Sequence, residues 1–404
     1  QSSARAGPSL VAALALLVGL GAAGAWPARA AEPLVIGEIN PRTGALALQG
    51  QSIHQGIVLA VEEQNARGGI GGRPLALISR DDEGKPERAL AAAEELTGRQ
   101  RAVALIGGYV DSLVGPIGEV ADRARVPYLA TASLDERLTQ RGNRYFFRIS
   151  SLNAYVRVTT GIVQDVFKAE RVAILYSQTP GASQLARRQK DLFERTGIRV
   201  VVFEPFSPGL SDFTPLLARV RDQRADVLLS DTFFADHLLL VRQMAQTGIR
   251  IRAFLGAFGM EFPNVIRDLG PASEGLYGTT SWQPGVTLGG HDADSRAFID
   301  AYAKRFGSPP VPLSMHGYAA ARALLAALEG LARRGMPISG ESVRDALAAV
   351  DLETPLGRVK FDERGEPLFY ERVIVQIQGG RHVVVYPRER ATAPPPPPPP
   401  PPRP

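Results

Sequence analysis

Short apolar segments alternate with helical patterns along almost the whole chain, and this alternation limits the possible folds more than any other feature. The first segment, Leu34–Ile39, ends in a Pro/Thr/Gly turn and is followed by a helical pattern over Gln51–Arg67. Gly68 and Gly69 end that helix, and Leu75–Ser79 begins the next apolar segment. Such alternation is typical of parallel sheets covered by helices, so we predict an α/β fold. The further strands predicted in the first two thirds are 103–106, 128–130, 172–176, 200–203, 227–229 and 252–255.

The number of predicted strands favours two lobes over one sheet, because a single open sheet of this width would be unusual. A break in the alternation at Ser150–Asn153 separates the lobes. After Gly278 the pattern changes to long helices, which we expect at 294–306, 314–334 and 341–350. Strands return at 358–361, 372–378 and 382–386. This order indicates that the chain returns first to one lobe and then to the other.

The two ends of the sequence have compositions of their own. Residues 1–30 combine Arg5, an apolar run and Ala28-Arg29-Ala30, which predicts a signal peptide cleaved near Ala30 and export to the periplasm. A membrane anchor is the alternative, although the run is short for one. Residues 389–404 end in an unbroken proline run, which predicts an extended or disordered tail. The tail is either inert or a ligand for a proline-reading partner.

Charge and composition exclude several functions. The formal net charge is +5, without a basic cluster interleaved with aromatic residues, so we predict no nucleic-acid partner. The sequence contains no cysteine, and its five histidines lack metal-ligand spacing. There is no Gly-x-Ser-x-Gly motif, which argues against a serine hydrolase. The glycine-rich segment 68–72 follows a predicted helix, whereas a phosphate-binding loop precedes one. We therefore predict no catalytic site, no metal and no cofactor, and we expect a monomer.

A series of spaced motifs carries a family resemblance. The chain resembles the type 1 periplasmic ligand-binding proteins of ABC importers, in particular the branched-chain amino-acid (Leu/Ile/Val) group. The resemblance implies two Rossmann-like lobes with mostly parallel sheets flanked by helices, three hinge crossovers, and a ligand enclosed by hinge closure. From the spacing we expect lobe 1 to comprise 33–148 plus 279–354, and lobe 2 to comprise 149–278 plus 355–388. The motifs are Val35-Ile36-Gly37, Pro41-x-Thr43-Gly44, Asn65-x-x-Gly68-Gly69-Ile70, Asp81-Asp82, Leu105-Ile106-Gly107, Val126-Pro127, Phe147-Arg148 and Phe361-Asp362-x-x-Gly365.

Ligands of open α/β sheets bind at the carboxyl ends of the strands, which locates candidate residues in the first lobe. The strand at 103–106 ends in a loop where the family offers a hydroxyl and backbone amides to a ligand carboxylate. Ser112 is placed to do so, whereas Asp111 would repel an anion unless it only caps the following helix. Thr131 and Ser133 are donors at the next strand end, or turn residues only. The further candidates here are Leu48, Gln49 and Tyr109.

In the second lobe the resemblance to amino-acid binders is weaker. Phe258 stands where those proteins have a glutamate for the ligand ammonium, and Phe233 and Gly181 stand where they have tyrosines. We interpret Phe233, Phe258, Tyr109 and Leu48 as an apolar or aromatic slot, with lobe core as the alternative for the phenylalanines. Asp231 is a candidate replacement for the missing glutamate.

These observations predict a periplasmic receptor that captures a small ligand for the membrane permease of an ABC importer. A ligand sensor with a regulatory partner is the alternative, and an enzyme on the same scaffold is disfavoured. We expect the ligand to be a small aromatic or branched apolar molecule with a polar or carboxylate end. An apolar amino acid is the second candidate. Asp111 stands against both, because it would favour a neutral amide or a cation.

Overall fold

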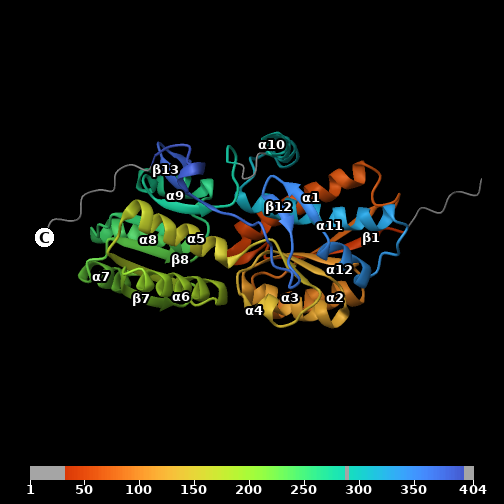
Figure 1. Cartoon of the computed structure of the whole chain (residues 1–404), viewed down its shortest axis with the longest axis horizontal. Helices are drawn as coiled ribbons and strands as arrows, with labels where there is room; N and C mark the ends of the chain where they lie inside the picture. Colours follow the sequence, from red (N-terminus) through yellow and green to blue (C-terminus); the bar gives the residue numbers. More distant parts are fainter. Residues whose placement is uncertain (1–31, 287–290, 395–404) are drawn as a thin grey trace, which may run out of the picture.

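The computed structural model describes residues 32–286 and 291–394. Its strands form two mainly parallel sheets with helices packed against them, one in each half of the molecule (Figure 1). The predicted α/β fold is therefore confirmed. The predicted signal peptide and most of the proline-rich tail lie outside the described residues. In the described ranges, no helix has the length and apolar character needed to cross a membrane.

The first sheet has five parallel strands in the order β2-β1-β3-β4-β5. Every residue of β3 is buried, because helices cover both faces of the sheet and leave no side of a central strand exposed to water. The strands run over β1 (Leu34–Asn40), β2 (Leu75–Asp81), β3 (Ala104–Tyr109), β4 (Tyr128–Ala132) and β5 (Phe146–Arg148).

The helices of the first lobe come from two distant parts of the sequence. The helix α1 packs closely along α11, since a Cβ atom on Gly56 would lie only 1.9 Å from Ser314 O. The colours of Figure 1 show that α10, α11 and α12 lie with the N-terminal elements. These helices are α1 (Ala47–Ala66), α2 (Pro86–Gly98), α3 (Asp111–Ala124), α4 (Arg137–Gln140), α10 (Asp292–Phe306), α11 (Pro312–Arg333) and α12 (Gly340–Ala348).

The second sheet has seven strands in the order β14-β13-β10-β9-β8-β6-β7. Its last two strands, β13 and β14, run antiparallel to their neighbours. The strands are β6 (Arg171–Ser177), β7 (Arg199–Phe206), β8 (Val227–Asp231), β9 (Ala253–Gly256), β10 (Tyr277–Thr280), β13 (Val373–Gln378) and β14 (Arg381–Tyr386). The helices of this lobe are α5 (Leu152–Ile162), α6 (Pro180–Arg195), α7 (Thr214–Asp222), α8 (Phe234–Thr247) and α9 (Pro263–Leu269).

The chain passes between the sheets three times: after β5, after β10 and before β13. The hairpin β11 (Asp351–Thr354) and β12 (Gly357–Lys360) precedes the third passage and forms a separate sheet. The predicted passage near 355 falls inside this hairpin. The next segment still lies against the first lobe, because Arg148 N donates to Gly365 O, and the chain joins the seven-stranded sheet at Val373.

One buried arginine contacts all three passages. The Arg372 guanidinium donates through Nη2 to Thr279 O at 2.7 Å and through Nη1 to Tyr370 Oη at 2.7 Å. Its central carbon lies 3.9 Å from the centroid of the Tyr155 ring. Tyr155 follows the first passage, Thr279 lies at the second, and Tyr370 and Arg372 lie at the third. A single side chain therefore fixes the three connections relative to one another.

Candidate functional site

A cavity lies where the carboxyl ends of strands from both sheets face each other. It contains about 540 Å³ of space not filled by atoms, part of it open to solvent. A cavity between two lobes that is lined mainly by apolar and aromatic groups is typical of a site for a small molecule. The first sheet contributes residues that follow β3 and β4, and the second sheet contributes residues that follow β6, β8 and β9.

The turn from β3 into α3 forms the first-lobe wall. Val110 has a φ of +65°, a conformation that is strained for a β-branched residue. Its amide donates to Ala132 O at 3.1 Å, which holds the end of β3 against the end of β4. Gly108, with a φ of +94°, comes close to Tyr128, where an added Cβ atom would lie 2.2 Å from the hydroxyl. The sharp turn directs Tyr109 and Asp111 to the cavity.

Asp111 lies in the cavity wall and does not cap its own helix. Its Oδ1 accepts from Leu134 N and from Asp135 N, each at 2.7 Å, and thereby holds the loop after β4. Its Oδ2 points to the second lobe, since a Cβ atom on Gly181 would lie 2.3 Å from it. Burial raises the pKa of the Asp111 carboxyl, although the two amide donors oppose this effect.

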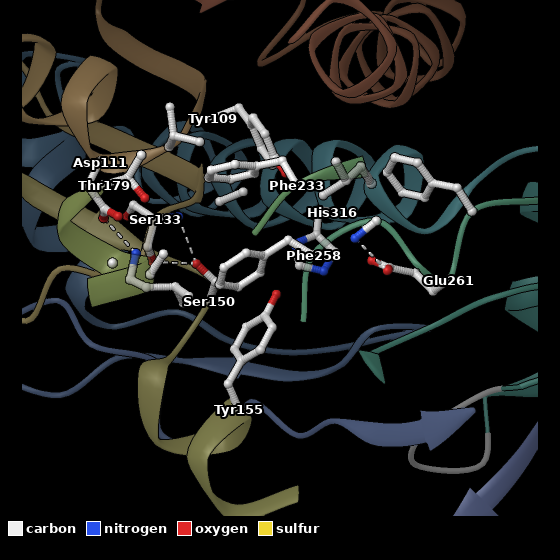
Figure 2. A pocket seen from close by; sticks show the side chains of 18 residues that line it. Tyr109, Asp111, Ser133, Ser150, Tyr155, Thr179, Phe233, Phe258, Glu261 and His316 are labelled. Atoms are coloured by element: carbon white, nitrogen blue, oxygen red, sulfur yellow. Dashed lines mark hydrogen bonds between the residues drawn. The ribbon is translucent and has the colours of Figure 1, made fainter. Parts of the chain in front are cut away.

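Four aromatic rings form a continuous cluster along the cavity. Phe233 and Phe258 stack with their centroids 5.5 Å apart and their planes at 28°. Tyr109 meets Phe233 edge-on at 6.0 Å, and Tyr155 meets Phe258 edge-on at 5.2 Å. Figure 2 shows the rings side by side in the middle of the site. The cluster spans the two lobes, because Tyr109 belongs to the first and the other rings to the second.

Two further polar residues, Glu261 and His316, line the cavity, and Figure 2 shows Glu261 on the opposite side of the rings from Asp111. Glu261 Oε2 accepts from Gly259 N at 2.8 Å, and its Oε1 lies 3.9 Å from Arg372 Nη2. Burial raises the pKa of Glu261 to about 7. His316 pairs through Nδ1 with Thr131 O at 3.2 Å and through Nε2 with the Ser281 hydroxyl at 2.7 Å.

The hydrogen-bond partners of His316 define which of its ring nitrogens carries the hydrogen. Because a carbonyl oxygen can only accept, Nδ1 carries the hydrogen and Nε2 accepts from Ser281. Burial lowers the pKa of His316 to about 4, so the ring is neutral at pH 7. His316 therefore offers no charge to a bound molecule.

Two serines complete the polar lining next to Asp111. Ser150 Oγ donates to Ser133 O at 2.8 Å and accepts from Ser133 N at 3.1 Å. Ser133 Oγ is buried and has no hydrogen-bond partner among the described residues. The hydrogen-bonding capacity of this hydroxyl is therefore unused within the described part of the chain.

Six of the eleven candidates proposed from the sequence line this cavity: Tyr109, Asp111, Ser133, Gly181, Phe233 and Phe258. The other five do not. Leu48 and Gln49 lie in the first turn of α1, and Ser112 is exposed on α3. Thr131 donates to Gly108 O at 2.6 Å inside the first lobe.

Asp231, the fifth of these candidates, is buried at the end of β8. Gln189 Nε2 approaches its Oδ1 at 3.4 Å, and its Oδ2 has no partner among the described residues. Burial raises the pKa of Asp231 to about 8.

Sequence reasoning overlooked several lining residues. Glu261 lies five residues beyond the end of β9 and three beyond Phe258, the candidate predicted in that loop. Ser150 lies in the predicted break between the lobes, and Thr179 lies two residues before the candidate Gly181. Tyr155 lies on α5, and Leu313 and His316 lie on α11, far in sequence from any strand end. The length of the loop after β9 is the signal that would have found Glu261; the two helices carry no local signal.

A second set of contacts joins the lobes outside the cavity. Gln184 Nε2 donates to Asp135 Oδ1 at 2.6 Å, and Gln184 Oε1 accepts from Glu136 N at 3.0 Å. Arg188 Nη1 donates to Glu136 Oε1 at 2.8 Å. These residues do not line the cavity, so they hold the lobes together independently of what the cavity contains.

Two lobes with mainly parallel sheets, three connections and a cavity between the strand ends define a two-lobed receptor for a small solute. The sequence profile of the periplasmic binding protein family matches residues 33–381. This chain therefore belongs to that family, and the predicted resemblance is confirmed.

Relatives and solved structures agree with this assignment. A leucine-, isoleucine-, valine-, threonine- and alanine-binding protein of Pseudomonas aeruginosa is 27 % identical over 339 residues, which are 83 % of this chain and 88 % of the relative. The branched-chain amino-acid binding protein LivJ of Streptococcus pneumoniae, solved with isoleucine, has a TM-score of 0.78 at 21 % identity and covers 88 % of this chain and 100 % of its own. An ABC-transporter solute-binding protein of R. palustris, solved with benzoate, has a TM-score of 0.76 at 19 % identity and covers 87 % of this chain and 95 % of its own.

Proposed function

We propose that this protein captures a small solute with an aromatic or branched apolar body and delivers it to the membrane permease of an ABC importer. It works as a monomer in the periplasm, and the lobes close on the solute by a hinge motion. The protein binds its solute without changing it chemically.

The aromatic cluster is the observation that carries this proposal. Tyr109 in one lobe contacts Phe233 in the other, so the apolar wall is complete only when the lobes are close together. An apolar ligand packed against these rings removes surface from water on both lobes, at about 25 cal/mol per Å², and so favours closure. Two of the similar solved structures contain benzoate and isoleucine, and these small solutes with an aromatic and a branched body support the proposal.

An apolar amino acid is the second candidate ligand, and Glu261 is the observation that favours it. Its carboxylate lines the cavity, although Phe258 replaces the glutamate expected from the resemblance. An ammonium group could pair with this carboxylate while the side chain lies among the rings. Against this candidate, Glu261 already has Gly259 N and Arg372 as neighbours.

A thermal-shift screen of the purified protein tests the proposal, with amino acids, aromatic acids, amides and amines as test compounds. A ligand at 100 times its Kd adds about 2.7 kcal/mol to the free energy of unfolding. We expect compounds with an aromatic or branched body to stabilise the protein, and Phe233→Ala to reduce this effect. If no compound of any class stabilises the protein, the proposed function is wrong.

A further inference from the structure

Two helix N-termini face the cavity from opposite lobes. Helix α3 begins at Asp111 in the first lobe, and α6 begins at Pro180 in the second. The first amides of a helix lack partners within it, and the helix dipole adds positive potential there. In α6 the first backbone hydrogen bond of the helix runs from Ser183 N to Thr179 O. The amides of Gly181 and Ala182 come before it and therefore have no partner within the helix. Such a position favours an anion.

The protein places its own anion at this position. Asp111 Oδ1 takes two amide hydrogens of the loop after β4, and Oδ2 lies against Gly181 at the start of α6. Any side chain at 181 would place its Cβ atom 2.3 Å from Oδ2, so the carboxylate would have to move. The space between the helix ends is therefore already occupied by a carboxylate that belongs to the chain.

The remaining lining also lacks a partner for a ligand carboxylate. Among the described residues that line the cavity there is no lysine or arginine, whereas two are acidic, Asp111 and Glu261. His316 has both ring nitrogens engaged by Thr131 and Ser281. The nearby Arg372 is buried behind the wall and donates to Thr279 and Tyr370.

We infer that Asp111 excludes carboxylate ligands and selects a solute that presents an N–H donor, an amine or an amide, to its Oδ2. This inference rests on the proposed function and specifies the ligand class of the same cavity. The apolar body of the solute lies along Phe233 and Phe258, and the unpaired Ser133 hydroxyl provides a further polar contact beside Asp111. Asp111 is thus the residue that determines specificity.

Three compounds with the same ring test the inference by calorimetry: benzylamine, benzamide and benzoate. Isoamylamine, isovaleramide and isovalerate repeat the test with a branched body. We expect the amine or the amide of at least one set to bind the wild-type protein at least about tenfold more tightly than the matching acid, because a hydrogen bond to a charged group contributes about 1.5–3 kcal/mol.

Two variants of Asp111 separate its charge from its structural role. In Asp111→Asn the side-chain oxygen still accepts from the amides of Leu134 and Asp135, while an NH2 group replaces Oδ2. We expect this variant to keep the melting temperature of the ligand-free protein and to lose about 10- to 100-fold in affinity for the amine or amide. Asp111→Ser empties the site between the helices, so we expect it to bind benzoate or isovalerate about tenfold more tightly than the wild type does.

Gly181→Ala provides a test that does not depend on the fold of the Asp111 variants. The added methyl group displaces Oδ2, so we expect weaker binding of the amine or amide in the wild-type background and no further loss in Asp111→Ser. A carboxylate that binds the wild type as well as its matched amine and amide overturns the inference but leaves the proposed function intact. The inference is also overturned if Asp111→Asn binds the amine and amide unchanged, or if none of the six compounds binds any of these proteins.

Discussion

Gln184 joins Asp135 across the two lobes at a distance of 2.6 Å, and it also accepts from the next amide, that of Glu136. One side-chain amide thus uses its donor and its acceptor on the opposite lobe. Neither Gln184 nor Asp135 lines the cavity. Closure of the lobes therefore has a component that is independent of the ligand.

Gln184→Ala should weaken ligand binding without touching the ligand. The two lost hydrogen bonds contribute about 0.5–1.5 kcal/mol each, so we expect an affinity about 5- to 150-fold lower. The loss should appear as faster dissociation, because the closed form opens more readily. Stopped-flow release of the bound solute measures this rate. The control is Gln178→Ala, since the Gln178 side chain accepts from Ser207 of its own lobe and has no other side-chain bond among the described residues. Equal dissociation rates for wild type and Gln184→Ala would show that the contact does not stabilise closure.

Phe258→Ala should destabilise the protein and its complex. Phe258 contacts two other rings of the cluster and is only 8 % exposed, so its removal leaves a void between the lobes. We expect the free energy of unfolding to fall by about 3–5 kcal/mol and the affinity for an apolar solute to fall with it. Urea unfolding measures the first effect. Phe369→Ala is the matched control, because Phe369 is 43 % exposed and its loss should change stability little.

Asp231→Asn should change how stability depends on pH. Burial raises the pKa of Asp231 to about 8, so the folded state keeps the proton while the unfolded state releases it above about pH 4. The unfolded state then binds fewer protons, and this group makes the folded protein less stable as pH rises from about 4 to 8. Asparagine cannot titrate. The melting temperature of the variant, minus that of the wild type, should therefore increase by several degrees between pH 5 and pH 9.

The control for this pH profile is Asp191→Asn, on the exposed side of α6. A flat difference for Asp231→Asn would mean that Asp231 is ionised in the folded protein at neutral pH.

Arg372→Lys should destabilise the protein although it keeps the charge. A lysine lacks the planar fork that reaches Thr279 and Tyr370 together and that stacks on Tyr155. We expect a loss of about 2–4 kcal/mol in the free energy of unfolding, measured with denaturant. Arg381→Lys, at the exposed start of β14, is the control and should leave the free energy of unfolding unchanged. If Arg372→Lys also leaves it unchanged, a positive charge alone is sufficient at this site.

The sequence predicts the parts of this molecule that depend on local pattern. The strands β3, β6 and β8 are continuous apolar runs, and a run of that kind can be recognised without knowing its neighbours. Strand ends also locate Tyr109, Phe233 and Phe258, because in parallel sheets these positions meet at one edge. The β11–β12 hairpin was harder to predict, since its pairing depends on which strands are free nearby.

The parts of the site that depend on tertiary structure could not be read from the sequence. His316 comes from α11, whose position relative to β4 is set by close packing against α1. The orientation of Asp111 depends on the two amides of another loop, so the sequence left open whether it caps a helix or faces the cavity. Both questions concern the meeting of distant segments, for which a local pattern carries no information.

The contacts of Arg372 hold the three connections together where they enter the second lobe. Tyr155 on α5 and Thr279 on β10 belong to the same lobe as β13, which begins at the residue after Arg372, so these contacts stay intact when the lobes move apart. Bending of the connections therefore takes place on the first-lobe side of Arg372. An oversized solute would hold the lobes apart by an angle set by its size, and the separation would be largest at the edges of the lobes far from the connections.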